Sequence, residues 1–208
     1  FYVAYLLSKK HVDLILDIGC GPGIMLHNTD ATFKIGLDIS FDSLKQAKLL
    51  DPNIELIQGD ATLLPFKDNY FSNIIAMHLI PVVDLHKGGN AWLNCAQELK
   101  RISSKNSEIM LTGANRMSRH FKNTHPLESR KKYLTYKKQA DFFKNDFSVQ
   151  VEGFGPHPKK IMAALKILYK FPDSFLENLG IPNIIYRLLR SSRYLKNGRS
   201  YIIICKRK

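Results

Sequence analysis

The chain of 208 residues has few cysteines and no long apolar run. Its three cysteines, Cys20, Cys95 and Cys205, form no CxxC pair and no even framework, so neither structural zinc nor a disulfide scaffold is expected. No apolar run approaches the roughly 18 residues that a membrane-spanning helix needs. The apolar residues 1–7 are followed at once by Ser8 and two lysines, so we expect no secretory signal and a reduced, cytoplasmic setting.

Acidic residues are scarce in the second half of the chain. Residues 1–110 contain 10 Lys or Arg and 12 Asp or Glu, whereas residues 111–208 contain 21 and 6. The net charge of +13 therefore comes from the second half. A basic region of this kind attracts anions such as phosphates or an acidic membrane surface, although a solvated, solubilising face has the same composition.

Strand-like and helix-like segments alternate through residues 13–115. The apolar runs predict strands at residues 13–19, 33–39, 54–58, within 71–83, and at 108–113. The helical spacing of apolar residues predicts helices at 41–50, with Ser40 as N-cap, and at 90–102. Such alternation is typical of an α/β fold with a doubly wound, mostly parallel sheet that is covered by helices on both faces.

The second half has a different organisation. A basic helical segment is expected at residues 127–144, and strands at 148–152 and 199–206. Residues 153–198 are too long for a simple connection, and proline and glycine divide them into helical pieces at 158–169, 174–179 and 182–189. We therefore predict one domain over residues 1–208, with a helical insertion or lid before the last strand.

Three glycines at alternate positions follow the first strand, in the run LDIGCGPG at residues 16–23. A dinucleotide site needs GxGxxG, and a P-loop needs GK[ST]; neither is present. Asp17, before the first glycine, would repel a pyrophosphate but suits a cationic group. Asp38 ends the second strand, where a carboxylate can accept both hydroxyls of a ribose, and Asp60 ends the third, where it can accept from a purine amine. The three acids are expected at one sheet edge, where open α/β sheets bind ligands.

Four stretches carry a resemblance to a known family: LDIGCGPG (16–23), GLDIS…LKQAK (36–48), QGDATLLPFKDNYFSNIIAMHLI (58–80) and AQELKRI (96–102). With them the chain resembles the class I S-adenosylmethionine-dependent methyltransferases, in particular the ubiquinone/menaquinone-biosynthesis group. The resemblance covers residues 13–115 and implies S-adenosyl-L-methionine as cofactor. It also implies a seven-stranded sheet of order 3-2-1-4-5-7-6 with an antiparallel last strand.

The resemblance implies a role for each matching residue. Asp17 would lie near the methionine ammonium, and the backbone of Gly19, Cys20 and Gly21 would pass beneath the methionine moiety. The remaining roles are ribose binding by Asp38, packing of Ile39 on adenine, contacts of Asp60 and the Ala61 N–H with adenine, and a rim of Ala76, Met77 and His78 around the transferred methyl group.

His78 is the candidate general base, because it follows the fourth strand next to the expected position of the methyl group. The alternative is a histidine that is hydrogen-bonded to a loop carbonyl. Asp84 and His86 are interpreted as loop or cap residues, and the three cysteines as packing residues. No cluster has metal-ligand spacing, so no metal is expected.

The methyl acceptor has no signature as clear as that of the cofactor. The chain reads AMHL after the fourth strand, without the [DN]PP[YF] motif, and it contains no Pro-Cys pair, which disfavours nucleobase methylation at an exocyclic amine or at pyrimidine carbon. Two acceptors remain: a small or lipid-like molecule beneath the helical insertion, or RNA bound by the basic residues of 116–208. A third hypothesis is a non-catalytic, cofactor-binding partner subunit, which the retained Asp17, Asp38 and Asp60 disfavour.

Overall fold

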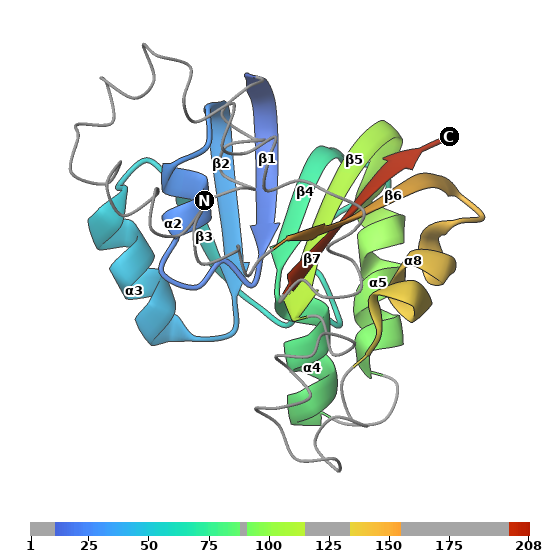
Figure 1. Ribbon diagram of the computed structural model, residues 1–208. Coiled ribbons are helices and arrows are strands. Elements are labelled where there is room, and N and C mark those ends of the chain that lie inside the picture. Colours follow the sequence, from blue (N-terminus) through green and yellow to red (C-terminus); the bar gives the residue numbers. More distant parts are fainter. Residues whose placement is uncertain (1–10, 88–90, 115–133, 155–199) are drawn as a thin grey trace, which may run out of the picture.

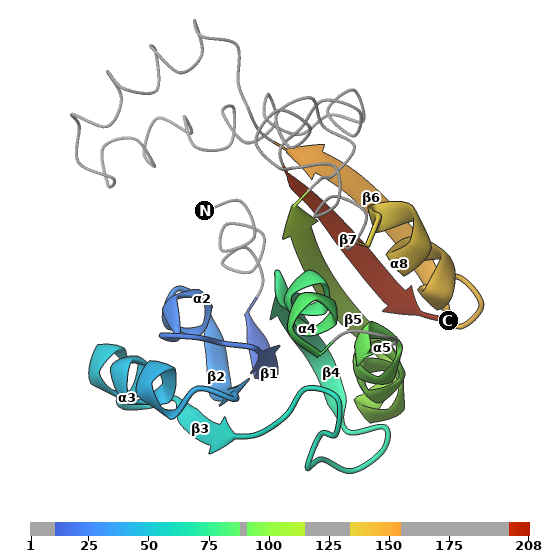
Figure 2. The same ribbon diagram turned by 90° about the horizontal axis from the view of Figure 1, so that it is seen from below.

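The structure is a computed structural model that describes residues 11–87, 91–114, 134–154 and 200–208 (Figure 1). Seven strands form one sheet in the order β3-β2-β1-β4-β5-β7-β6, which confirms the predicted order. Figure 2 shows β3 and β6 at opposite ends of the sheet. The strands are β1 (Val12–Ile18), β2 (Ala31–Asp38), β3 (Glu55–Gln58), β4 (Phe71–Met77), β5 (Ser103–Ala114), β6 (Phe147–Phe154) and β7 (Ser200–Arg207).

Strand β7 is the strand that runs against its neighbours. It pairs antiparallel with both β5 and β6, whereas the pairs among β1 to β5 are parallel. The carboxyl ends of β1 to β5 therefore meet at one edge, where α/β sheets place their ligands. The predicted insertion at residues 153–198 lies outside the described residues, except for Gly153 and Phe154, which extend β6.

Helices cover both faces of the sheet, as a doubly wound fold requires. They are α2 (Ile24–His27), α3 (Phe41–Leu50), α4 (Leu79–Lys87), α5 (Ala91–Ile102) and α8 (Tyr136–Phe143). One buried cluster joins the sheet to α4, α5 and α8, and a second joins its other face to α2 and α3. Figure 1 shows α2 and α3 beside β2 and β3, and α5 and α8 beside the strands at the other end of the sheet. Within the described residues, no helix has the length and apolar character needed to cross a membrane.

Local sequence signals account for several of these boundaries. Ser40 caps α3 as predicted, since its hydroxyl accepts a hydrogen bond from the Ser43 N–H at 3.2 Å. The interpretation of Asp84 and His86 as loop or cap residues was wrong, because both lie in helix α4. Pro81 lies in the first turn of α4, where a missing backbone N–H costs no helical hydrogen bond.

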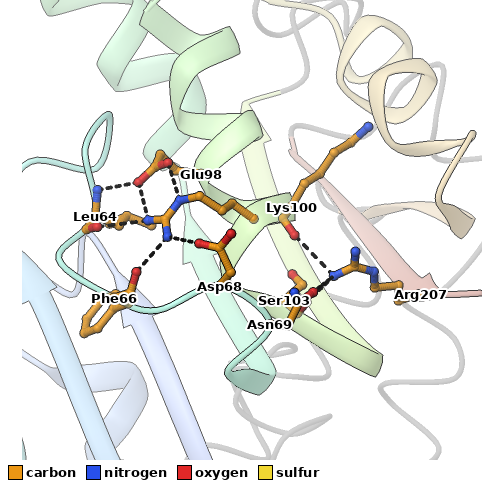
Figure 3. Close-up of polar contacts among 9 residues, drawn as sticks. Leu64, Phe66, Asp68, Asn69, Glu98, Lys100, Ser103 and Arg207 are labelled. Atoms are coloured by element: carbon orange, nitrogen blue, oxygen red, sulfur yellow. Dashed lines mark hydrogen bonds and ion pairs between the residues drawn. The ribbon is translucent and has the colours of Figure 1, made fainter.

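Arg101 of α5 holds the connection between β3 and β4 to that helix, and Figure 3 shows its partners Leu64, Phe66, Asp68 and Glu98. The Arg101 guanidinium donates to the carbonyls of Phe66 (2.7 Å) and Leu64 (3.0 Å) and to the carboxylates of Asp68 and Glu98. Glu98 in turn accepts from the Leu64 N–H at 2.6 Å, and its hydrogen bond with Arg101 lowers the pKa of Glu98. This network fixes the segment that begins with Asp60 and Ala61.

A second arginine holds the far end of the same connection. Arg207 of β7 donates to the Asn69 side chain at 3.1 Å and to the carbonyls of Lys100 and Ser103 (Figure 3). Arginine suits both positions because its planar fork reaches several acceptors at once. The second half of this connection, from Leu64 to Asn69, is thus held by two arginines.

We expect Arg101→Lys to lower the free energy of unfolding by about 1–3 kcal/mol, because a lysine ammonium cannot reach both carbonyls and both carboxylates. Chemical denaturation measures the change. Lys144→Gln is the control, since Lys144 pairs with Asp141 where both side chains are 62% exposed; it should cost no more than about 0.5 kcal/mol. Equal stability of R101K and the wild type would contradict the assigned role.

Candidate functional site

The glycine loop connects β1 to α2 at the carboxyl edge of the sheet. Gly19, Gly21 and Gly23 all have positive φ, at 73°, 53° and 76°. The Gly19 and Cys20 N–H groups donate to the Leu37 carbonyl of β2 at 2.7 and 3.1 Å. A Cβ placed on Gly21 would meet no atom within 4 Å, so the loop backbone borders open space. Glycine there permits the left-handed turn and leaves the backbone accessible to a ligand.

Asp38 joins this loop to the start of α3. Its two carboxylate oxygens accept hydrogen bonds from the Gly21 N–H and the Ser40 N–H, both at 2.8 Å. Each oxygen keeps the capacity for a further hydrogen bond. Asp38 therefore orders the glycine loop and can still receive two hydroxyl groups of a ligand.

Asp60 lies beyond the end of β3 and is already well supplied with donors. One of its oxygens accepts from the Thr62 N–H (2.9 Å) and the Thr62 hydroxyl (2.8 Å), and the other forms an ion pair with Lys87 of α4. Partial burial opposes ionisation, but the hydrogen bonds from Lys87 and Thr62 lower the pKa of Asp60 overall. Asp60 is therefore an ionised acceptor at neutral pH.

Asp17 lies at the carboxyl end of β1, just before the glycine loop, and is buried, with 1% of its surface exposed. Its Oδ1 has no hydrogen-bond partner among the described residues. Burial, and secondly the charge of Asp38, raise the pKa of Asp17 to about 8. A buried, unpartnered carboxyl group beside an open glycine loop fits a ligand that brings positive charge.

The cysteines are buried and free, which agrees with their predicted packing role. A Cβ on Gly36 would lie 2.8 Å from the Cys20 sulfur, so this thiol fills the space between the loop and β2. Burial, followed by the charges of Asp17 and Asp38, raises the pKa of Cys20 to about 12. The Cys20 thiol is therefore a packing group and not a nucleophile.

A pocket of about 260 Å³ opens at the carboxyl ends of β2, β3 and β4. Most of the predicted cofactor residues line it: Gly19, Asp38, Ile39, Asp60, Ala61 and Met77. His78, the predicted base, lines it as well. Asp17, Cys20, Gly21 and Ala76 are absent from its lining; Asp17, Cys20 and Ala76 are buried behind the wall.

His78 turns the chain from β4 into α4. Its φ of 58° is in the left-handed region, which is uncommon outside glycine, and its N–H donates to the carbonyl and hydroxyl of Thr112 at 3.1 and 3.2 Å. Within the described part of the chain, the ring has no hydrogen-bond partner, so the alternative of a ring bonded to a loop carbonyl is not realised there. Partial burial lowers the pKa of His78, which leaves the imidazole neutral and able to accept a proton.

Sequence reasoning missed the wall that α4 contributes to the pocket. Leu79, Val83 and Lys87 recur every four residues and all line it. Four-residue spacing is the signal that could have identified this helical face; a strand was predicted within 71–83, ending before His78, but no helix was predicted after it.

A second hollow of about 330 Å³ lies at the opposite edge of the sheet, far from the glycine loop. Its lining is polar and includes Asp13, Asn73, Asn106, Glu108 and Lys206. Glu108 and Lys206 pair with each other at 3.2 Å. Among the residues that the structure describes, no three His, Cys, Asp or Glu side chains gather as a metal site; the expectation of no metal stays a prediction.

Residues 15–102 match the family model described as a methyltransferase domain. The family match covers less than half of the chain, and together with the fold it agrees with a methyltransferase domain of the class I, S-adenosylmethionine-dependent type. The match agrees with the expected methyltransferase class and with S-adenosyl-L-methionine as the expected cofactor. The ubiquinone/menaquinone-biosynthesis group is not confirmed.

Solved structures share the fold at low identity. A S-adenosylmethionine-dependent methyltransferase from Archaeoglobus fulgidus superposes with a TM-score of 0.65 at 19% identity, covering 98% of this chain and 90% of its own. One from Thermotoga maritima gives a TM-score of 0.67 at 16% identity, covering 100% and 89%. These similarities extend the fold assignment over the whole sheet.

Two curated relatives match part of the chain. An uncharacterised protein of Methanocaldococcus jannaschii is 30% identical over 119 residues, which are 56% of this chain and 48% of that protein. A phosphatidylethanolamine N-methyltransferase of Cereibacter sphaeroides is 27% identical over 147 residues, which are 65% of each chain. The chain thus spans about half to two thirds of the length of these relatives.

Asp17 should make stability depend on pH in an unusual direction. Its pKa is about 8 in the folded protein and 3.8 as a model value, so the folded state holds the proton more tightly. The free energy of unfolding therefore falls as pH rises between about 4 and 8. Asp17→Asn removes this dependence, and its stability relative to the wild type should rise by at least about 1 kcal/mol from pH 5 to pH 8.

Denaturation curves at several pH values test this prediction. Asp42→Asn is the matched control, because the Asp42 side chain is exposed on α3 and should leave the pH slope unchanged. Parallel pH profiles for D17N and the wild type would show that Asp17 is ionised in the folded state.

Proposed function

We propose that the protein transfers a methyl group from S-adenosyl-L-methionine to a small or lipid-like acceptor. The observation that carries the proposal is one pocket in which Asp38, Asp60 and His78 converge beside the open glycine loop. Membership of the ubiquinone/menaquinone-biosynthesis group, a single domain over residues 1–208 and a cytoplasmic location stay predictions within this proposal.

The residues of the site fit the cofactor. Asp38 would receive the ribose hydroxyls, Ile39 would pack on adenine, and Asp60 and the Ala61 N–H would contact the adenine edge. Asp17, with an unpartnered buried oxygen behind the pocket wall, would act on the methionine ammonium through water or the loop backbone. When bound, S-adenosyl-L-methionine supplies an electrophilic methyl carbon on a sulfonium sulfur.

His78 would act on the acceptor. An amine or hydroxyl attacks carbon with its lone pair and must lose a proton, which the neutral imidazole of His78 can accept. Met77, Leu79 and Val83 give the pocket apolar walls that keep water away from the reacting groups. The rest of the catalysis is positioning, because methyl transfer from a sulfonium is an in-line displacement.

A small or lipid-like acceptor is favoured by the apolar wall of α4 and by the similarity to a phosphatidylethanolamine N-methyltransferase. RNA remains the alternative from the sequence, but the basic residues 116–133 and 155–199 lie outside the described residues, as does the predicted insertion. Contact of the basic second half with an acidic membrane surface is likewise a prediction from the sequence, because these residues lie outside the described ones. The non-catalytic alternative predicts cofactor binding without methyl transfer to any acceptor.

Cofactor binding is the direct test of the site. S-adenosylhomocysteine should raise the melting temperature of the wild type, because a ligand of the native state stabilises it by mass action. Asp38→Ala should weaken binding at least about tenfold, since hydrogen bonds to a charged carboxylate are lost. Asp42→Asn, on exposed α3, should bind as the wild type does. No thermal shift at millimolar ligand would refute the proposal, and unchanged affinity of D38A would refute the ribose assignment.

The His78 assignment is tested by His78→Asn. Asparagine tolerates the left-handed φ of this position but cannot accept a proton at neutral pH, so S-adenosylhomocysteine affinity should stay within about twofold while methyl transfer falls by about 10²–10⁴. The assay follows radiolabelled methyl groups into a fractionated cell extract. Label that partitions into organic solvent supports a lipid-like acceptor, and nuclease-sensitive label contradicts it. Equal transfer rates for H78N and the wild type would remove His78 from the mechanism.

A further inference from the structure

Lys87 has a contact that the cofactor site does not need. It ends α4 and reaches back to Asp60, with which it forms an ion pair, and to the Thr62 hydroxyl at 3.2 Å. The side chains of Lys87 and Asp60 are 41% and 36% exposed, so the pair lies at the rim of the pocket. A pair at this exposure is weak enough to exchange partners.

The ion pair occupies the atom that a ligand amine would use. Thr62 supplies two donors to Asp60 Oδ1, and Lys87 supplies its ammonium to Oδ2. Oδ2 can accept a second hydrogen bond, but an exocyclic amine there would lie against the Lys87 ammonium, which is also a donor, so the two compete for the same oxygen. Release of Lys87 is the simplest way for this carboxylate to accept a purine amine.

A released Lys87 has no other acid to pair with in the pocket wall that the structure describes. The only other acidic residue in that lining is Asp38, whose remaining acceptor capacity the proposed function gives to the ribose hydroxyls. Leu79 and Val83 precede Lys87 on the same face of α4, so the ammonium stands at the end of an apolar wall. Such a wall with one terminal cation suits a molecule that has an apolar part and an anionic group.

We propose that Lys87 exchanges Asp60 for an anionic, phosphate-bearing group of the methyl acceptor when the adenine amine of the cofactor binds Asp60. The proposal rests on the proposed function. It makes binding ordered: the cofactor releases Lys87, and the acceptor then uses it. The pair with Asp60 also keeps the anion site closed while no methyl donor is present.

The first test measures S-adenosylhomocysteine affinity by titration calorimetry. Lys87→Met removes the competitor for Asp60, so affinity should rise about two- to fivefold at low salt. The difference should shrink at about 0.5 M salt, where the wild-type pair is screened. Lys45→Met is the control, because Lys45 pairs with Asp42 on exposed α3 and should not change affinity. Unchanged or weaker affinity of K87M would overturn the proposal, whereas absence of any binding by the wild type would instead overturn the proposed function.

The second test probes the anion site with phosphoethanolamine. The wild type should bind it only when saturated with S-adenosylhomocysteine, and K87M should bind it at least about tenfold more weakly under the same conditions. Ethanolamine, which lacks the phosphate, should show no difference between the two proteins. Vesicles of phosphatidylethanolamine are tested in parallel. Binding of the vesicles but not of phosphoethanolamine indicates a lipid headgroup, and binding of phosphoethanolamine indicates a free phosphate compound. The assignment of Lys87 to the anion would be overturned if binding of the probe did not depend on S-adenosylhomocysteine or on Lys87, or if neither probe were bound.

Discussion

The carboxylate of Asp38 joins three segments of the site, namely the end of β2, the glycine loop after β1 and the start of α3. It ends β2, accepts the N–H of Gly21 from the loop after β1, and accepts the N–H of Ser40 at the start of α3. Charge-assisted hydrogen bonds of this kind are stronger than neutral ones, and they orient backbone that has no side chain of its own to anchor it. The open face of the glycine loop, the cap of α3 and the floor of the pocket all depend on this one side chain.

Much of the fold follows from patterns that are local in the sequence. Ser40 marks the start of α3 because its hydroxyl caps the helix, and β1 is recognisable because Ile15, Leu16 and Ile18 are apolar and fully buried. Helix α4 escaped prediction because its apolar residues continue those of β4 without a polar break, and only the left-handed turn at His78 separates the two elements. A single residue with positive φ leaves almost no trace in composition or periodicity.

The site was predictable where its chemistry is carried by strand ends, and not where it is carried by tertiary contacts. Asp38, Asp60 and His78 each end or follow a strand, so the topology alone brings them to one edge. The pairing of Lys87 with Asp60 joins residues 27 positions apart through the angle of α4, which no sequence pattern specifies. The same holds for Arg101, whose partners Leu64 and Phe66 lie in a connection without regular structure.

Three carboxyl groups lie at one edge of the sheet, and each is accommodated in a different way. Asp38 is stabilised by backbone donors, and Asp60 by Thr62 and Lys87. Asp17 has neither, and the cost of its burial is avoided by keeping the proton, as its raised pKa indicates. A ligand with an ammonium group would reverse that choice, since the ionised form of Asp17 then gains a partner. Under the proposed function, the buried carboxyl group that weakens the free protein would contribute to binding a cationic ligand, which is the behaviour expected when a site is built for its ligand at the expense of stability.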